Sequence, residues 1–126
     1  MNYKPFKELN ISTLGMGNMR LPTLKGGAID EARAQAMIDR CIEAGINYFD
    51  TAYRYHGGQS ELFVGKALNK YPRDKWYIAS KMPGHMMDYI DGKLAFKGYL
   101  TGEKIQHVSE IFEDQLKRCQ VDYFDF

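Results

Sequence analysis

The sequence has 126 residues, 44% of them hydrophobic and 26% charged, which is the size and composition of one ordinary globular domain. Its 17 basic and 16 acidic residues give a net charge of +1, too little to attract nucleic acid or an anionic membrane. MNYKPFKELN has no apolar run of signal-peptide length, and nowhere do about 18 apolar residues follow one another. We therefore expect a cytoplasmic protein without nucleic-acid or membrane partners.

The first part of the sequence predicts a strand, a helix and a second strand. Residues 11–17 (ISTLGMG) predict a short buried strand, preceded by a small hairpin through residues 3–9. Asp30 is placed to cap the helix, which ends before Gly45. Residues 46–50 (INYFD) predict the second strand. One apolar face of the helix has members at intervals of three and four residues: Ala34, Met37, Ile38, Cys41 and Ile42.

The second part continues the alternation. Ser60 is placed to cap a second helix, and residues 76–80 (WYIAS) predict a third strand. Residues 82–100 form a long connection, after which Thr101 opens a third helix, and residues 121–126 (VDYFDF) predict a fourth strand. The second helix has an apolar face of Phe63, Val64, Ala67 and Leu68. The third has a stripe of Ile105, Val108, Phe112, Leu116 and Cys119.

Strands that alternate with helices predict an α/β fold built from βαβ units with a parallel sheet. Right-handed crossovers place the helices on one face, which curls the sheet toward a TIM (β/α)8 barrel. A complete barrel needs eight units and about 250 residues, so this chain supplies about the first four βα units. We expect residues 1–126 to form the N-terminal half of such a barrel domain, with exposed sheet edges through which a homo-oligomer can form.

The cysteines and histidines predict no metal site. Cys41 and Cys119 both fall on apolar helix stripes, where a reduced thiol behaves as a small buried hydrophobe. His56, His85 and His107 lack ligand spacing to one another.

Three polar residues stand at or just after predicted strand ends. Asp50 ends the second strand, Tyr55 follows it by five residues, and Lys81 follows the third strand. Because active sites of parallel barrels are built at the carboxyl ends of the strands, we expect these side chains to converge. Delivering hydride to a carbonyl leaves negative charge on oxygen that must take up a proton, and a phenol can supply it. A nearby lysine, held by a carboxylate, favours the phenolate form and so makes the phenol a better acid.

These strings resemble the aldo-keto reductase family over essentially the whole chain: LGMGNMRLP, GINYFDTAYRYHGGQSELFVGKAL, IASK and QLKRCQVDYFDF. The resemblance implies an NADP(H)-dependent oxidoreductase that reduces an aldehyde or ketone. It implies Tyr55 as the proton donor, with Lys81 and Asp50 as its tuning pair.

The resemblance also implies a cofactor site at the strand ends. Asp50 would lie near the nicotinamide ribose, and Gly17, Asn18 and Met19 near the nicotinamide end. The family's fourth catalytic residue is a histidine beyond VDYFDF, which these 126 residues do not include, and the loops that hold most of the nucleotide are absent too. The connection after Lys81 is similar to that of a subgroup whose members often end in an iron-sulfur segment, also absent here.

Several alternatives stand beside this interpretation. Tyr53 is a rival for Tyr55, although the family spacing favours Tyr55. A dinucleotide fingerprint at Gly15 and Gly17 is disfavoured, because Arg20 replaces the third glycine. The methionines of residues 82–100 either line a substrate pocket or fill gaps under a lid, and the sequence does not separate the two.

Two hypotheses for the polypeptide follow. In the first, it is a truncated piece of a reductase and is inactive alone. In the second, it is a non-catalytic half-barrel that self-associates or complements a second half.

Overall fold

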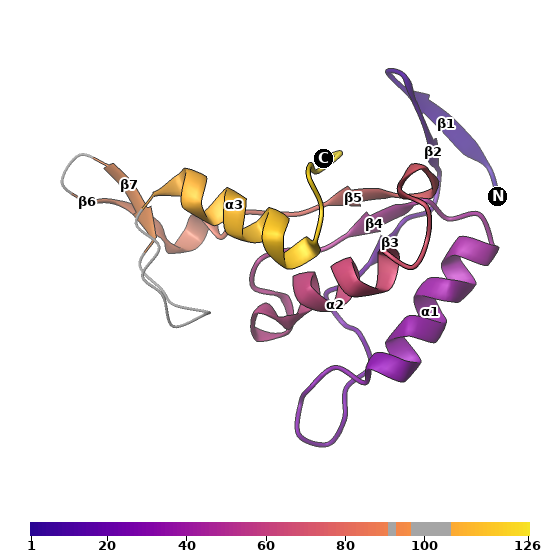
Figure 1. Cartoon of the computed structure of the whole chain (residues 1–126), viewed down its shortest axis with the longest axis horizontal. Helices are drawn as coiled ribbons and strands as arrows, with labels where there is room; N and C mark the ends of the chain where they lie inside the picture. The colour runs from indigo at the N-terminus through magenta and orange to yellow at the C-terminus, as the bar shows by residue number, and fades with distance from the viewer. Residues whose placement is uncertain (91–92, 97–106) are drawn as a thin grey trace.

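The computed structural model describes residues 1–90, 93–96 and 107–126 (Figure 1). An N-terminal antiparallel hairpin consists of β1 (Tyr3–Phe6) and β2 (Leu9–Ser12). A parallel sheet in the order β3-β4-β5 consists of β3 (Met16–Gly17), β4 (Tyr48–Asp50) and β5 (Tyr77–Ala79). A second hairpin consists of β6 (Met87–Ile90) and β7 (Lys93–Phe96). The helices are α1 (Glu31–Glu43), α2 (Gln59–Leu68) and α3 (Val108–Cys119).

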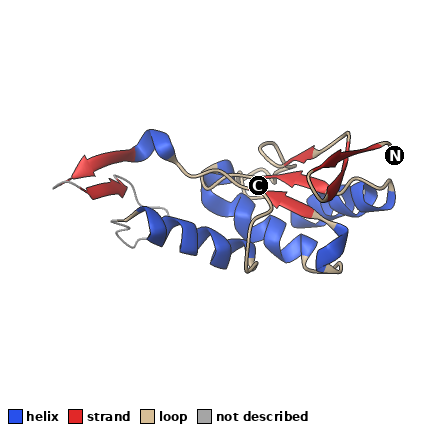
Figure 2. Cartoon of the chain, turned by 90° about the horizontal axis from the view of Figure 1, so that it is seen from above, coloured by secondary structure: helices blue, strands red, loops and turns tan. Residues whose placement is uncertain are grey.

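The parallel sheet confirms the predicted βαβ pattern. Phe49 in β4 lies in register with Met16 on one side and with Ile78 on the other. Figure 2 shows the helices together on one face of this sheet, as right-handed crossovers require. Phe49 is fully buried in the core, and side chains alternate along a strand, so Asp50 points to the face away from the helices.

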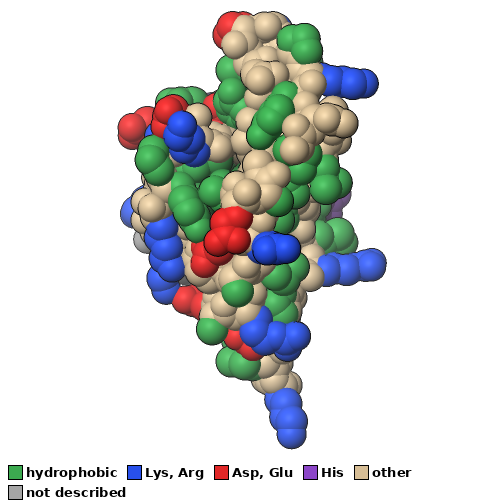
Figure 3. Space-filling model, turned by 90° about the vertical axis from the view of Figure 1, so that its right-hand side faces the viewer, with side chains coloured by type: hydrophobic (Ala, Val, Ile, Leu, Met, Phe, Trp, Pro, Cys, Tyr) green, Lys and Arg blue, Asp and Glu red, His purple; other side chains and the backbone are tan. Residues whose placement is uncertain are grey.

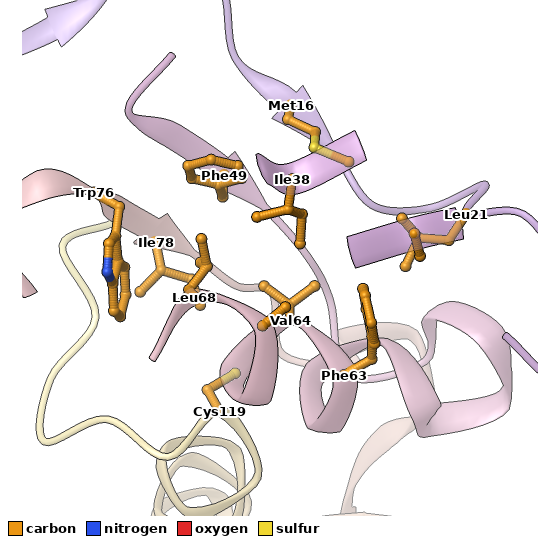
Figure 4. Close-up of a cluster of buried hydrophobic side chains, with 12 residues drawn as sticks. Met16, Leu21, Ile38, Phe49, Phe63, Val64, Leu68, Trp76, Ile78 and Cys119 are labelled. Atoms are coloured by element: carbon orange, nitrogen blue, oxygen red, sulfur yellow. The ribbon is translucent and has the colours of Figure 1, made fainter. Parts of the chain in front are cut away.

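The hydrophobic core lies between the sheet and the helices (Figure 4). Its fully buried members include Ile38 from α1, Val64 and Leu68 from α2, and Trp76 and Ile78 from the third βα unit. The predicted apolar face of α2 is buried throughout, and α1 buries Ala34 and Ile38 while Met37 stays 45% exposed. Periodicity therefore identified the packed faces of α1 and α2.

The stripe predicted for α3 was wrong in part: its buried residues are Ile111, Gln115, Arg118 and Cys119, and of the predicted stripe Phe112 is 42% exposed. The polar Gln115 and Arg118 are buried there by their bonds to Glu61.

Both cysteines are free thiols, as predicted. Cys119 is fully buried, and burial raises the pKa of its thiol. Cys41 is partly buried, with its Sγ 3.5 Å from Sδ of Met16, and burial raises its pKa as well. Both shifts disfavour the reactive thiolate.

Two glycines are required by their surroundings. A Cβ at Gly65 in α2 would lie 2.2 Å from the carbonyl oxygen of Cys119, so α2 and α3 approach each other through the missing side chain. Gly45 ends α1 with a φ of +84°, a left-handed conformation that glycine adopts without strain.

The helix starts agree only partly with the sequence. The Asp30 side chain accepts a hydrogen bond from the Arg33 amide at 3.2 Å, which confirms the α1 cap. Ser60 does not cap α2, because the helix begins at Gln59 with the left-handed Gly58 as its N-cap, two residues before the predicted cap. In α3, His107 caps the helix and Glu110 completes a capping box. The predicted start at Thr101 lies outside the described residues, as does Ile105.

Two strand predictions were wrong in detail. The run 11–17 is divided, because Ile11 and Ser12 belong to the hairpin strand β2, while only Met16–Gly17 joins the sheet. Residues 121–126 form no strand, because the Asp125 carboxylate accepts the Ile78 amide hydrogen at 2.8 Å, a bond that a strand carbonyl would otherwise make. The amides of Asp125 and Phe126 still donate to the Ile78 carbonyl, at 3.1 and 3.3 Å, so the segment runs beside β5.

The long connection predicted over 82–100 contains a hairpin that was not predicted. The β6–β7 hairpin projects beyond the N-terminal end of α3, away from the N-terminal hairpin (Figure 1). The rest of the connection within 91–92 and 97–100 lies outside the described residues.

The molecular surface has no single-sign field on the face seen in Figure 3, where acidic, basic and hydrophobic side chains are interspersed. None of the helices in the described part of the chain is long and apolar enough to cross a bilayer.

Candidate active site

The carboxylate of Asp50 and the ammonium of Lys81 form a close ion pair at the carboxyl ends of β4 and β5. Lys81 Nζ donates to both Asp50 oxygens at 2.6 Å and to the Thr51 carbonyl at 3.0 Å. Their side chains are 50% and 31% exposed, for Lys81 and Asp50 respectively. The pair is therefore fixed in geometry but open to a ligand.

Strand register explains why these residues meet. Asp50 lies in register with Ala79, so the two strands end at one level and Lys81 follows two residues later. The ladder continues past the strands, because the Thr51 amide donates to Ala79 and the Tyr53 amide to the Lys81 carbonyl, at 2.9 and 3.2 Å. Two hydrophobic strands in parallel register thus place a carboxylate beside an ammonium.

Tyr55 completes the cluster from the turn that follows β4. It begins the 3-10 turn η1 (Tyr55–Gly58), and its ring centroid lies 5.2 Å from Lys81 Nζ. Its side chain is partly buried. The structure thus brings Asp50, Tyr55 and Lys81 together at one end of the sheet.

The pKa of Lys81 is raised above its usual value. Partial burial is the largest influence and opposes the charged form, but the hydrogen bonds and negative charge of Asp50, with smaller contributions from Tyr55, outweigh it. The ammonium is therefore the stable form across the neutral range.

Tyr53 and Tyr55 have different surroundings. Tyr53 is fully buried, packs with Ile111 and lies under the Arg118 guanidinium, 5.1 Å from the ring centroid. Burial, followed by the charge of Asp114, raises the pKa of Tyr53 to about 12. Of these two tyrosines, Tyr55 lies beside Lys81, so the geometry favours it over its rival.

The residues predicted near the nicotinamide cluster at the end of β3. Gly17 lies in register with Asp50, and a Cβ added to it would meet no atom within 4 Å. Asn18 is fully buried, and both its backbone amide and its side-chain amide donate to the Asp50 carbonyl, at 2.9 and 2.8 Å. Met19 is 57% exposed. The structure therefore places Gly17 and Asn18 next to Asp50, and Met19 follows them in the chain with its side chain exposed.

The methionines after Lys81 divide between two settings. Met86 and Met87 pack against buried Tyr53 and Ile111, which supports the gap-filling interpretation for them. Met82 is 38% exposed and lines a hollow of about 360 Å³. That hollow is lined by Ser80, Met82, Phe112, Gln115, Phe124, Asp125 and Phe126, so it does not include the ion pair.

A buried polar cluster behind the site was not predicted. Glu61 of the GGQSE string is fully buried and pairs with Arg118, with 2.9 Å between Oε2 and Nε. Gln115, only 2% exposed, donates to the same carboxylate at 2.7 Å. Polar side chains at 115 and 118, beside the buried Ile111 and Cys119, were the available sequence signal.

His56 also has a role that ligand spacing did not suggest. Its Nε2 accepts a hydrogen bond from the Leu21 amide at 3.0 Å, and its backbone is left-handed, with a φ of +53°. Ser60 joins the same region, because its hydroxyl lies 2.9 Å from that of Thr51 and donates to the Asn18 carbonyl at 3.2 Å. These bonds tie the loop after β3 to the turn that carries Tyr55.

Comparison with known proteins gives consistent matches. The profile of the aldo/keto reductase family matches residues 13–126. Aldo-keto reductase YhdN of Bacillus subtilis is 32% identical over 128 residues, covering 99% of this chain and 36% of its own length. Probable aldo-keto reductase 1 of Glycine max is 34% identical over 115 residues, covering 91% of this chain and 31% of its own.

A solved aldo-keto reductase from Bacillus halodurans, in its holo form, has the same fold over this chain. It superposes with a TM-score of 0.70 at 32% identity, covering 99% of this chain and 38% of that one. The chain spans about a third of the length of the curated relatives it matches.

Proposed function

Because the chain belongs to the aldo/keto reductase family, with the fold of an open part of its (β/α)8 barrel, we propose that it carries the proton-transfer residues of a carbonyl reductase. The observation that carries this proposal is the contact of Lys81 with both Asp50 oxygens, with the Tyr55 ring beside the same ammonium. We propose residues 1–126 as the N-terminal half of the barrel domain and an aldehyde or ketone as the substrate.

Each residue has a distinct part in the proposed chemistry. Tyr55 donates its hydroxyl proton to the carbonyl oxygen as negative charge develops there. The Lys81 ammonium stabilises the negative charge that remains on the phenol oxygen. Asp50 keeps Lys81 protonated and holds it against the sheet, which leaves the ammonium with one arrangement in place of many.

The end of β3 fits the nicotinamide end of NADPH, which supplies the hydride when bound. Gly17 leaves its surroundings open to the close approach of a flat ring, and Met19 is exposed beside it. Asn18 Oδ1 is buried with no hydrogen-bond partner among the described residues, while the Asn18 amide groups fix the backbone of Asp50. We propose that Gly17, Asn18, Met19 and Asp50 hold this end of the cofactor.

A chimeric barrel tests the proposal. This chain replaces the part of Bacillus subtilis YhdN that it matches, and oxidation of NADPH is followed with a simple aldehyde. We expect turnover that falls about 100-fold or more in Tyr55→Phe, because the proton donor is lost. Tyr53→Phe is the matched control and should retain turnover. A Tyr55→Phe chimera as active as its parent would contradict the proposal.

The 126-residue chain alone is expected to be inactive, so its own NADPH-dependent turnover would overturn that part of the proposal.

A second candidate, self-association of the half-barrel, is favoured by exposed aromatic rings. The Phe126 ring lies 5.4 Å from both Phe6 and Tyr48, and Phe6 and Phe126 stay 49% and 38% exposed. A second copy that covers these rings would bury apolar surface. Light scattering should then give a dimer mass that Phe126→Asp returns to a monomer; a monomer in the parent chain would exclude this candidate.

A further inference from the structure

One buried carboxylate collects hydrogen bonds from several elements behind the site. Glu61 Oε1 accepts from the Ser80 hydroxyl at 2.6 Å and from the Gln115 side-chain amide at 2.7 Å. Its Oε2 accepts from Arg118 Nε at 2.9 Å. Both oxygens are therefore used, and the buried negative charge is balanced by Arg118, as a carboxylate without water contact requires.

This cluster reaches the residue that carries the ammonium. The Gln115 amide nitrogen also lies 3.2 Å from the Lys81 carbonyl and 3.1 Å from the Ser80 hydroxyl. The Lys81 carbonyl accepts from the Tyr53 amide as well, at 3.2 Å. The backbone at Lys81 is thus fixed from two sides, by α3 and by the segment after β4.

The same cluster reaches the turn that carries Tyr55. The Arg118 guanidinium donates to the Gly58 carbonyl, and Gly58 is the last residue of η1. Arg118 also lies over the Tyr53 ring. Glu61 and its partners therefore contact the backbone at Lys81 and at Gly58. Among the bonds of the described residues, none joins them to the side chains of Asp50, Tyr55 or Lys81.

We propose that Gln115 is a positioning residue, which holds the Lys81 backbone so that the ammonium rests on Asp50 beside Tyr55. The catalytic consequence rests on the proposed function, whereas the positioning does not. A side-chain amide has two N–H groups, and here they are shared among the Glu61 carboxylate, the Ser80 hydroxyl and the Lys81 carbonyl. Glu61 orients the amide, and the amide in turn anchors the strand end.

Exposure explains why Lys81 needs this anchor. Its side chain is 50% exposed, and a long solvated lysine has many competing rotamers. Gln115 is 2% exposed, so its own conformation is fixed by packing and by the ion pair behind it. The rigid, buried Gln115 amide thus fixes the backbone position from which the flexible, exposed Lys81 side chain extends.

The experiment compares two glutamine-to-methionine variants of the full chain. Gln115→Met keeps the length of the side chain and leaves Glu61 paired with Arg118 and Ser80, but removes the donor to Lys81. Gln35→Met is the matched control, because Gln35 donates only to Asp39 on α1, at 2.6 Å, among the bonds described. The Lys81 side chain is titrated by carbon-13 NMR in the parent and in both variants, alongside thermal melting.

We expect the Lys81 pKa to fall by about half a unit or more in Gln115→Met, because the ammonium loses its fixed contact with Asp50. Gln35→Met should leave it unchanged. A merely structural role would lower the melting temperature of Gln115→Met without moving the Lys81 titration, and that result overturns the proposal.

If Gln115→Met does not fold, Gln115→Ala decides the matter. It also removes the donor to the Lys81 carbonyl but places no apolar atoms against the Glu61 carboxylate, and the same downward shift is expected. An unchanged Lys81 titration in folded Gln115→Ala overturns the proposal.

The titration uses neither cofactor nor substrate, so it separates this proposal from the proposed function. If the Lys81 pKa does not fall in Gln115→Met while the YhdN chimera reduces a carbonyl, the positioning role is refuted and the proposed function is not. If the Lys81 pKa falls as expected but the YhdN chimera reduces no carbonyl, the proposed function is refuted and the positioning role is not. Where the chimera is active, Gln115→Met should lower kcat about tenfold and leave NADPH affinity unchanged.

Discussion

Two carboxylate pairs near the carboxyl end of the parallel sheet, Glu61–Arg118 and Asp50–Lys81, differ in their exposure to water. Glu61 and Arg118 are 0% and 6% exposed, whereas Asp50 and Lys81 are 31% and 50% exposed. Both have near-ideal distances, 2.9 Å in the first and 2.6 Å in the second. The difference is therefore one of solvent and not of geometry.

This difference in exposure suits the two pairs to different roles: the buried pair stabilises the structure around the site, and the exposed pair can interact with a ligand. A buried pair cannot exchange its partner for water, so it fixes the elements that contribute it. A half-exposed pair contributes little to stability, but its charge is available to a ligand. The predictions below test this division, beginning with the largest expected change in the free energy of unfolding.

Glu61→Ala should lower the free energy of unfolding by about 3–5 kcal/mol, because Arg118 then stays buried without its carboxylate. Chemical denaturation measures the loss. The control is Glu31→Ala, which breaks an exposed pair with Lys66 and should cost less than about 1 kcal/mol. Equal losses in the two variants would mean that the buried pair has no special role.

Gly65→Ala should cost about 1–3 kcal/mol, since the new Cβ overlaps the Cys119 carbonyl and forces α2 away from α3. Gly26→Ala is the control, because a Cβ there meets no atom within 4 Å. Comparing the melting temperatures of the two variants checks this contact, and an unchanged value for Gly65→Ala would show that the helices are farther apart.

Lys81→Met should change the free energy of unfolding by less than about 1 kcal/mol, since the Asp50–Lys81 pair is partly exposed to water. In the YhdN chimera the same change should nevertheless reduce turnover about 100-fold or more. Denaturation and kinetics on the same preparation test both parts. A loss of stability as large as that of Glu61→Ala would mean that the Asp50–Lys81 pair, like the Glu61–Arg118 pair, stabilises the fold.

The smallest effect is the pH dependence of the Asp50–Lys81 pair. The folded-state pKa of Lys81 is raised above the usual 10.5, so its contribution is fully present below that value and is lost as pH rises through the folded pKa. The stability difference between the parent and Lys81→Met should thus stay constant from neutral pH to about 10 and shrink above it. A difference that shrinks below pH 9 would contradict the sign of the shift.

The sequence predicted the parts of the fold that depend on periodicity and register. The buried faces of α1 and α2 follow from apolar spacing, and the meeting of Asp50 with Lys81 follows from parallel strands that end together. The β6–β7 hairpin was missed although Asp91 and Gly92, between its two strands, are a dipeptide typical of two-residue hairpin turns. Residues 121–126 read as a strand, since nothing local reveals that a side chain, Asp125, takes the place of a backbone acceptor.

The structure brings Asp50, Tyr55 and Lys81 together as predicted, but the buried polar residues that pack behind them were not predicted. A glutamate in GGQSE and a glutamine in α3 lie 54 residues apart in sequence, and only the packing of α2 on α3 joins them. Ser60 looked like a helix cap because its spacing suits one, but its hydroxyl bonds to Thr51 and Asn18 instead. The catalytic roles themselves stay predictions.

The bond from the Leu21 amide to His56 has a consequence for the imidazole itself. A backbone N–H is always a donor, so Nε2 must offer its lone pair and the single ring proton must sit on Nδ1. The tautomer that is the minor one for a free histidine in water is thus selected by the main chain of a loop 35 residues away. Nitrogen-15 spectra of a histidine-labelled sample would show this as one pyridine-like and one pyrrole-like resonance with the assignments reversed from the solvated case.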